Sequence, residues 1–302
     1  NKYINDSSGH CIMKYMNAIF WSRVTLIATI ALLGVFAWQT PAWSGDNDEF
    51  LVVSFLDVGQ GDAIHIETPD GFEMLIDGGA TTQVLRQLAS GRQFFDRQID
   101  VVLATHPDTD HIGGLVDVLK RYQVATVVQS KVKNDTPATQ AFTQAVANEQ
   151  SEVVYVQRGD VIALGASTTV RVLSPAGDVS DWQSNTASIV VQVQYGDIEF
   201  LLTGDAPTGI EEYIASYYGE QLESEVLKLG HHGSNTSTSK TFLAIVQPQY
   251  AIVSAGVDNR YGHPHSKVVE RTAQQGARLL NTAQYGTITF ATDGQSVWQT
   301  QQ

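Results

Sequence analysis

Four side chains that can bind metal ions lie within six residues of one another, in the segment His106-Pro-Asp-Thr-Asp-His111. Imidazole nitrogen suits zinc or iron, and carboxylate oxygen widens the choice toward manganese. The apolar run at 99–104 precedes this segment and is typical of a buried strand, which would deliver all four ligands at its carboxyl end. The segment therefore predicts a metal site, with a solvated acidic loop as the alternative.

Three later segments add further candidate ligands. They are residues 201–205, 226–234 and 261–265. The first two are apolar runs that lead into Asp205 and into the pair His231-His232, and the third contains His263. Of the 8 histidines in the chain, two lie in the first cluster and four in these later ones. Such a concentration of ligands at the ends of apolar runs predicts a metallohydrolase.

Taken as a set, these residues resemble the metallo-β-lactamase superfamily and, within it, the hydrolase domain of ComEC-type DNA-uptake proteins. The resemblance covers nearly everything from Leu51 to the C-terminus. It rests on Phe55-Leu-Asp-Val-Gly-Gln-Gly-Asp62, Leu75-Ile-Asp-Gly-Gly79, the cluster at His106, the run Asn185 to Val191, Leu202-Thr-Gly-Asp205, His231-His-Gly-Ser234 and Tyr261-Gly-His-Pro264. It implies an α/β fold of αββα type, in which helices flank two mixed sheets, for a hydrolase domain at 50–302.

The resemblance also implies two divalent ions, Zn²⁺ or Mn²⁺. Their ligands would be His106, Asp108, Asp110, His111, Asp205 and His231. The first two would hold one ion, the next two the other, and Asp205 would bridge them. His231 would complete the second site, with His232 as the less favoured alternative, and Asp77 would hydrogen-bond the ligand loop without binding metal. Because Asp108 stands where the family usually has histidine, the first site favours manganese or weakly held zinc.

The chemistry expected at such a centre is hydrolysis by a water molecule that two metals acidify. Asp110 or Asp205 would orient this water, and His263 would stabilise the transition state or protonate a leaving oxygen. The candidate substrate-binding residues are Ser234, Asn235, Thr236, Gln60 and Asp62. The alternative for the first three is a polar loop that caps the helix near Lys240, and for the last two a tight turn between strands.

Short apolar runs alternate with helical patterns beyond residue 50. The expected strands are 51–56, 63–67, 73–76, 99–104, 125–129, 153–156, 161–163, 168–173, 188–195, 198–202, 226–229 and 250–254. The expected helices are 82–88, 115–122, 139–148, 207–217, 241–246 and 266–275, followed by a hairpin around 292–294. Two mixed sheets packed face to face with helices outside would bury both sets. The ligand loops would then meet along one edge of the sandwich.

The first 50 residues differ from the rest. After an N-terminal tail at 1–17, residues 18–40 are mostly apolar and, with their flanks, long enough to cross about 30 Å of hydrocarbon. Basic residues precede this apolar stretch and acidic residues follow it. This asymmetry predicts a single-pass transmembrane anchor or uncleaved signal, with a cytoplasmic N-terminus and an extracytoplasmic hydrolase. A cleaved secretory signal and the last span of a larger channel protein are the alternatives.

Charge limits the choice of substrate. With 18 basic and 32 acidic residues the net charge is −14, so the chain lacks the broad basic face that usually attracts duplex DNA. Binding of nucleic acid would rest on the metals and a local groove. Candidates for that groove, which can equally be solvated surface charges, are Lys120, Arg121, Lys131 and Lys133.

The function expected from these features is that of an extracytoplasmic nuclease or phosphodiesterase that acts on DNA, single-stranded rather than duplex, during uptake. It would be tethered to the cytoplasmic membrane and would work beside a separate channel protein. A small-molecule hydrolase, such as a lactonase or phosphoesterase, is an alternative on the same fold. A second alternative is a non-catalytic module that holds a structural metal and passes DNA to a channel.

Overall fold

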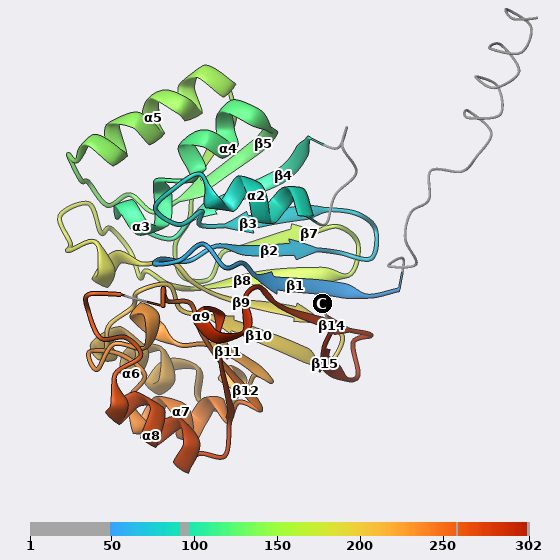
Figure 1. The fold of residues 1–302 in the computed structure, drawn as a ribbon, viewed down its shortest axis with the longest axis vertical. Coiled ribbons are helices and arrows are strands. Elements are labelled where there is room, and N and C mark those ends of the chain that lie inside the picture. The colour runs from blue at the N-terminus through green and yellow to red at the C-terminus, as the bar shows by residue number, and fades with distance from the viewer. Residues whose placement is uncertain (1–48, 91–96, 258, 301–302) are drawn as a thin grey trace, which may run out of the picture. The chain divides into compact units, whose positions relative to one another are not determined.

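A computed structural model describes residues 49–90, 97–257 and 259–300. Over these residues two β-sheets pack face to face, and helices cover the outer face of each sheet (Figure 1). This arrangement confirms the α/β sandwich of αββα type. The expected tail at 1–17 and membrane segment at 18–40 lie outside the described residues. Within the described residues, no helix combines the length and the apolar character that crossing a membrane requires.

The first sheet has eight strands in the order β15-β14-β1-β2-β3-β4-β5-β6. They are β1 Leu51–Phe55, β2 Ile64–Glu67, β3 Glu73–Ile76, β4 Gln98–Ala104, β5 Gln123–Gln129, β6 Glu152–Tyr155, β14 Ile288–Thr292 and β15 Val297–Gln299. Strands β3 to β6 pair in parallel, whereas the other neighbours pair antiparallel. The carboxyl ends of β3 to β6 therefore lie together at one edge.

The second sheet has seven strands in the order β13-β12-β11-β10-β9-β8-β7. They are β7 Val161–Leu164, β8 Thr168–Ser174, β9 Val190–Tyr195, β10 Ile198–Leu202, β11 Val226–Lys228, β12 Tyr250–Val253 and β13 Arg278–Asn281. Strands β10 to β13 are parallel. Their carboxyl ends form a second edge from which loops can extend.

Alternation of apolar residues directs one face of each sheet into the central core. Strand β1 alternates between buried and half-buried residues, and its Phe55 packs edge-on against Phe290, which in turn contacts Phe200. All three are fully buried, and burial of one such side chain stabilises the fold by about 1.5–3 kcal/mol.

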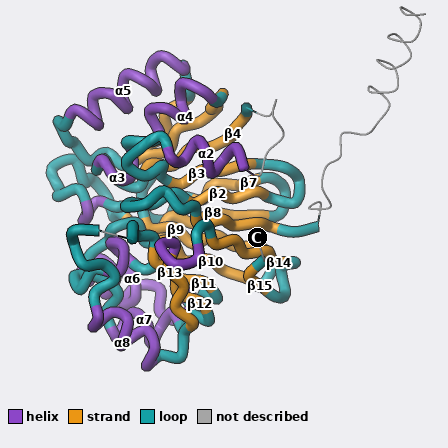
Figure 2. Tube along the Cα trace, in the orientation of Figure 1, coloured by secondary structure: helices purple, strands orange, loops and turns teal. Residues whose placement is uncertain are grey.

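Each outer face is covered by its own layer of helices (Figure 2). The first sheet carries α2 Gln83–Ser90, α3 Thr109–Ile112, α4 Leu115–Arg121 and α5 Pro137–Glu149. The second carries α6 Thr208–Tyr218, α7 Lys240–Val246 and α8 Ser266–Gln274. A short helix, α9 Thr282–Tyr285, joins β13 to β14.

Most differences from the expected elements fall in short segments. The sequence does not predict α3, which begins inside the ligand segment at Thr109, or the strand β13. Strand β9 begins at Val190 rather than Ser188, because a 3-10 turn occupies Asn185–Ala187. Helix α3 and strand β13 have four residues each, and the 3-10 turn has three. Segments this short do not show a hydrophobic periodicity in the sequence.

Candidate metal centre

The candidate ligands extend from the carboxyl ends of parallel strands in both sheets. Asp205 is central among them. Its Oδ1 lies 3.3 Å from Nε2 of His111, and its Oδ2 lies 3.9 Å from Nε2 of His106 and 3.6 Å from Nε2 of His232. The loops after β4, β10 and β11 therefore bring together side chains that are more than one hundred positions apart in the sequence.

Several buried polar atoms around this centre have no hydrogen-bond partner among the described residues. They are Nε2 of His106, Nε2 of His111, both ring nitrogens of His232, Oδ1 of Asp205 and Oδ1 of Asp62. Buried polar atoms rarely remain unpartnered unless an ion or a water satisfies them. Among the described residues, four groups of three ligand atoms lie within 4.8 Å of one another, and two of these groups are His106-His111-Asp205 and Asp110-His111-His232. These nitrogen and carboxylate donors fit divalent ions such as zinc or manganese.

The carboxylates make the centre favourable for positive charge. Burial opposes protonation of His111, but Asp205 and Asp77 outweigh it and raise the pKa of this imidazole well above its ordinary value. Burial is likewise outweighed at His232, where Asp205 raises the pKa to about 9. At His106 burial prevails and lowers the pKa to about 4. Metal binding at His111 and His232 must therefore be accompanied by release of protons.

Asp77 supports the ligand loop from behind. Its carboxylate accepts hydrogen bonds from the backbone N–H of Thr105 at 2.8 Å, from the hydroxyl of Thr105 at 2.7 Å and from Nδ1 of His111 at 2.7 Å. The hydroxyl of Thr105 also lies 3.0 Å from Nδ1 of His106. Both imidazoles are therefore held through Nδ1, which leaves Nε2 of each directed at the centre. Sequence reasoning expected this position for Asp77 but did not single out Thr105.

The two aspartates of the ligand segment differ in placement. Asp110 is half-buried, and its Oδ2 lies 3.4 Å from Nε2 of His232. Asp108 has a 36% exposed side chain, and its Oδ2 lies 3.8 Å from Nε2 of His106. Gly61 packs directly on the backbone of Asp110, so that a Cβ at this glycine would collide with the Asp110 carbonyl oxygen. The turn between β1 and β2 thereby holds the ligand segment in place.

The structure favours His232 over His231 as the histidine of the second site. His232 is 1% exposed and approaches three carboxylates, whereas the His231 side chain is 31% exposed. His231 still lies 3.6 Å from Asp205, but it belongs to neither close group of ligand atoms. Both residues adopt positive φ within a 3-10 turn at Gly230–Gly233. Positive φ at both residues ends the alternation of inward and outward side chains that a strand would show. The sequence pattern therefore could not indicate which histidine points inward.

We expect His232→Ala to lower the metal bound per chain to about half of the wild-type value, because it removes a buried ligand from one of two sites. His231→Ala should keep most of the metal, and it serves as a matched control one residue away. Elemental analysis after dialysis against buffered Mn²⁺ or Zn²⁺ measures both. The reverse order of losses would assign the second site to His231.

A fully buried lysine, Lys228, was not identified from the sequence. Its ammonium forms an ion pair with Asp62, donates to the Gly204 carbonyl at 3.1 Å and lies 4.0 Å from Oδ1 of Asp205. Asp62 is 1% exposed and also lies 3.3 Å from Nδ1 of His232. Asp62 therefore has almost no surface for the substrate contact that its motif suggested. The sequence feature that could have identified Lys228 was the position of a lysine within the apolar run at 226–229.

Comparison with known proteins agrees with this geometry. Residues 56–257 match the family described as the Metallo-beta-lactamase superfamily. The chain belongs to this superfamily. It is 33% identical over 258 residues to ComE operon protein 3 of Bacillus subtilis, covering 79% of this chain and 32% of that protein. It is 30% identical over 265 residues to competence protein ComA of Neisseria gonorrhoeae, covering 86% and 35%.

These curated relatives are ComEC-type competence proteins, and the chain spans about a third of their length. Among solved structures, Zn²⁺-bound PqqB from Methylobacterium extorquens matches with a TM-score of 0.52 and 12% identity, covering 77% of this chain and 97% of that one. At this identity the likeness concerns the fold alone. The resemblance seen in the sequence is thus confirmed at the level of family.

The remaining candidate residues of this metallo-β-lactamase domain lie on the rim of the centre. Thr236 Oγ1 lies 3.3 Å from Nδ1 of His231 and 2.9 Å from the Ser234 hydroxyl. Asn235 is exposed and accepts a hydrogen bond from an arginine of α8. The ring of His263 is centred 5.7 Å from that of His231. Thr236 and His263 therefore lie beside His231, Ser234 lies beside Thr236, and Asn235 lies toward α8.

The candidate Gln60 and the helix-capping alternative for the polar loop concern other surroundings. Gln60 lies in the turn between β1 and β2, with a buried side-chain oxygen that has no hydrogen-bond partner. The helix-capping alternative applies to Ser239, whose hydroxyl accepts from the backbone of Phe242 at 3.1 Å. Ser239, the last residue of the polar loop, therefore caps α7, whereas Ser234 and Thr236 lie toward His231.

A buried carboxylate, Glu211 of α6, holds this polar loop by accepting from the backbone N–H groups of Thr238 at 2.6 Å and Ser239 at 3.1 Å. Burial raises its pKa to about 7, against the opposing effect of these hydrogen bonds. Because the folded state holds the proton more tightly than the unfolded chain, stability is lost as pH rises from about 4.5 to about 7. The loss attributable to this group is about 3 kcal/mol.

Glu211→Gln should therefore flatten the pH dependence of stability between pH 5 and pH 8. Urea unfolding of the metal-free protein at both values measures the effect as a difference from wild type. Glu212→Gln, on the exposed side of the same helix, should behave as wild type. Equal pH dependence in Glu211→Gln and wild type would show that the carboxyl group titrates normally.

Proposed function

We propose that this metallo-β-lactamase domain is a metal-dependent phosphodiesterase that cleaves DNA, single-stranded rather than duplex, during uptake. The observation that carries the proposal is the cluster of unpartnered imidazole nitrogens and carboxylate oxygens around Asp205. Because Nε2 of His111 can bind only one ion, Asp205 would join two sites that clamp one phosphoryl group, with its Oδ1 near His111 and its Oδ2 near His106 and His232. The competence proteins among the relatives support DNA as the substrate.

Divalent ions, when bound, would supply a nucleophile from water at neutral pH and neutralise charge on the reacting phosphate. His106, His111, His232, Asp110 and Asp205 would hold them. Burial opposes ionisation of Asp110, but its close contact with His232 and the charge of His111 lower its pKa, so the carboxylate stays ionised and can orient the attacking water. Burial and the neighbouring His231 lower the pKa of His263, whose neutral ring would donate an N–H hydrogen bond to a leaving oxygen.

The proposal extends to location and partners. We place the hydrolase outside the cytoplasmic membrane, tethered through residues 18–40, with a separate channel protein as partner. The order of basic residues, apolar stretch and acidic residues in the N-terminal sequence supports this orientation.

The test is degradation of end-labelled single-stranded and duplex DNA by the full chain in Mn²⁺, in Zn²⁺ and in chelator, together with elemental analysis. We expect metal-dependent cleavage of the single strand, loss of cleavage in chelator and loss in Asp110→Ala. Intact DNA with turnover of a lactone would instead identify a small-molecule hydrolase. Bound metal without turnover of any substrate would indicate a non-catalytic module.

A further inference from the structure

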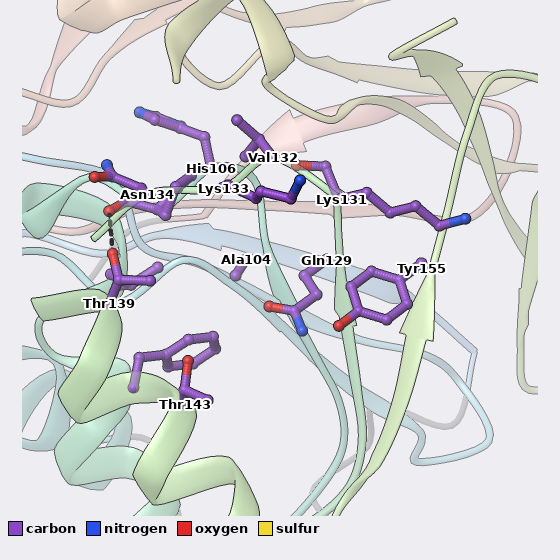
Figure 3. Close-up of a pocket in the computed structure, with 14 residues that line it drawn as sticks. Ala104, His106, Gln129, Lys131, Val132, Lys133, Asn134, Thr139, Thr143 and Tyr155 are labelled. Carbon is purple, nitrogen blue, oxygen red and sulfur yellow. Dashed lines mark hydrogen bonds between the residues drawn. The ribbon is translucent and has the colours of Figure 1, made fainter. Parts of the chain in front are cut away.

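A pocket of about 450 Å³ adjoins the candidate metal centre on the side of β4, β5 and β6 (Figure 3). His106 belongs to both, because it lines the pocket while its Nε2 faces Asp205. Three residues that line the pocket, Ala104, Gln129 and Tyr155, are register partners at the carboxyl ends of these parallel strands. Ligands of open α/β sheets commonly bind at such an edge. The volume suits a ligand the size of one nucleotide.

The lining of the pocket combines positive charge, an aromatic ring and hydrogen-bonding groups. Lys131 and Lys133 follow β5, and Tyr155 ends β6 with 52% of its surface exposed. Ser130 lies at the pocket wall, is 6% exposed and has a hydroxyl without a hydrogen-bond partner. Gln129 contributes a half-buried amide (Figure 3). Amines suit phosphates, while the ring and the amide suit a base.

Acidic neighbours do not block the two lysines. Lys133 lies 4.0 Å from Asp181, but both side chains are largely exposed, so the pair is weak and a phosphate can displace it. Asp178 is fully exposed, and Lys131 and Lys133 contribute, after its hydrogen bonds to Ser180, to the lowering of its pKa. In a chain of net charge −14, two lysines beside a metal centre form a local site rather than a broad basic face.

We propose that this pocket binds one nucleotide of a DNA single strand, the nucleotide next to the phosphodiester held at the metal centre. Lys131 and Lys133 contact its phosphate groups, and its base stacks on Tyr155 beside the amide of Gln129. Since a paired base cannot enter a pocket of this size, the site selects single strands over duplex. This inference rests on the proposed function for its substrate, but its binding test does not require cleavage.

The binding experiment uses a fluorescein-labelled single-stranded 12-mer and the full chain in chelator, followed by fluorescence anisotropy. Lys131→Gln/Lys133→Gln should weaken binding and lower the slope of log affinity against log salt by about 1.4, because each phosphate that a lysine neutralises on a single strand contributes about 0.7. Tyr155→Ala should weaken binding about tenfold. This second effect should vanish with an oligonucleotide of abasic sites, which keeps the phosphates and lacks bases.

A matched control and a second measurement distinguish failure of the pocket proposal from failure of the nuclease proposal. Arg86→Gln changes an exposed arginine of α2 outside the pocket and should bind as wild type. With Mn²⁺ present, the pocket variants should raise KM for the 12-mer much more than they lower kcat for its cleavage. Normal binding and KM in the pocket variants, or no binding by wild type, would overturn the pocket. Binding that depends on the pocket without any cleavage would instead overturn the nuclease proposal alone.

Discussion

Asp205→Asn is expected to abolish stable metal binding and to reduce metal-dependent hydrolysis by about a thousandfold or more. The carboxylate lies within 4.0 Å of four imidazoles and of the Lys228 ammonium. Loss of its charge removes a shared ligand and leaves the cationic His111, His232 and Lys228 without their central counter-ion. A thousandfold lower rate corresponds to a loss of about 4 kcal/mol in transition-state stabilisation, which is expected when a metal site fails to assemble.

Elemental analysis and the rate of bis(p-nitrophenyl) phosphate hydrolysis measure this effect in the same preparation. Glu270→Gln makes the same chemical change on the exposed face of α8 and should leave both values unchanged. Full metal content in Asp205→Asn, even with lower activity, would contradict the central position assigned to this carboxylate.

Lys228→Met is expected to destabilise the metal-free fold by about 3 to 5 kcal/mol, which is the usual cost of removing one partner of a buried ion pair. Methionine matches the length of the lysine stem, so the packing of β11 is largely kept. The destabilisation comes from the Asp62 carboxylate, which is 1% exposed and would keep only its contact with His232. Urea unfolding measures the free energy.

A double variant tests the origin of this destabilisation. Lys228→Met/Asp62→Asn removes both charges and should recover a large part of the stability, because no unpaired carboxylate then remains buried. Lys120→Met, at an exposed position of α4, should change the free energy of unfolding by less than about 0.5 kcal/mol. If the double variant is no more stable than Lys228→Met, poorer packing rather than the broken ion pair explains the effect.

Much of the architecture could be predicted because apolar runs in this chain are short, separate and regular. The runs before His106, Asp205 and His231 became β4, β10 and β11. Parallel strands end at a common edge, so ligands that follow such strands come together once the sheets pack. This relation made the convergence on Asp205 predictable from the sequence, although 99 positions separate it from His106.

The finer assignment of the site depends on features that a linear pattern does not carry. Positive φ at His231 and His232 decides which ring is buried, and the sequence preference for His231 had no access to that backbone. The pairing of Asp62 with Lys228 joins the turn after β1 to strand β11 of the other sheet. Such a contact exists only after the sheets pack, so Asp62 was assigned to the substrate.

The topology also sets when in its lifetime the chain can acquire a cation. The ligands extend from His106 to His232, and β1, the first strand of the domain, pairs with β14, which is complete only at Thr292. A nascent chain on the ribosome therefore lacks the later ligands at first. It also lacks β14, the strand that pairs with β1, until nearly all of this domain has been synthesised. Metal loading thus becomes a late event in the biogenesis of the domain, in whichever compartment its folding is completed.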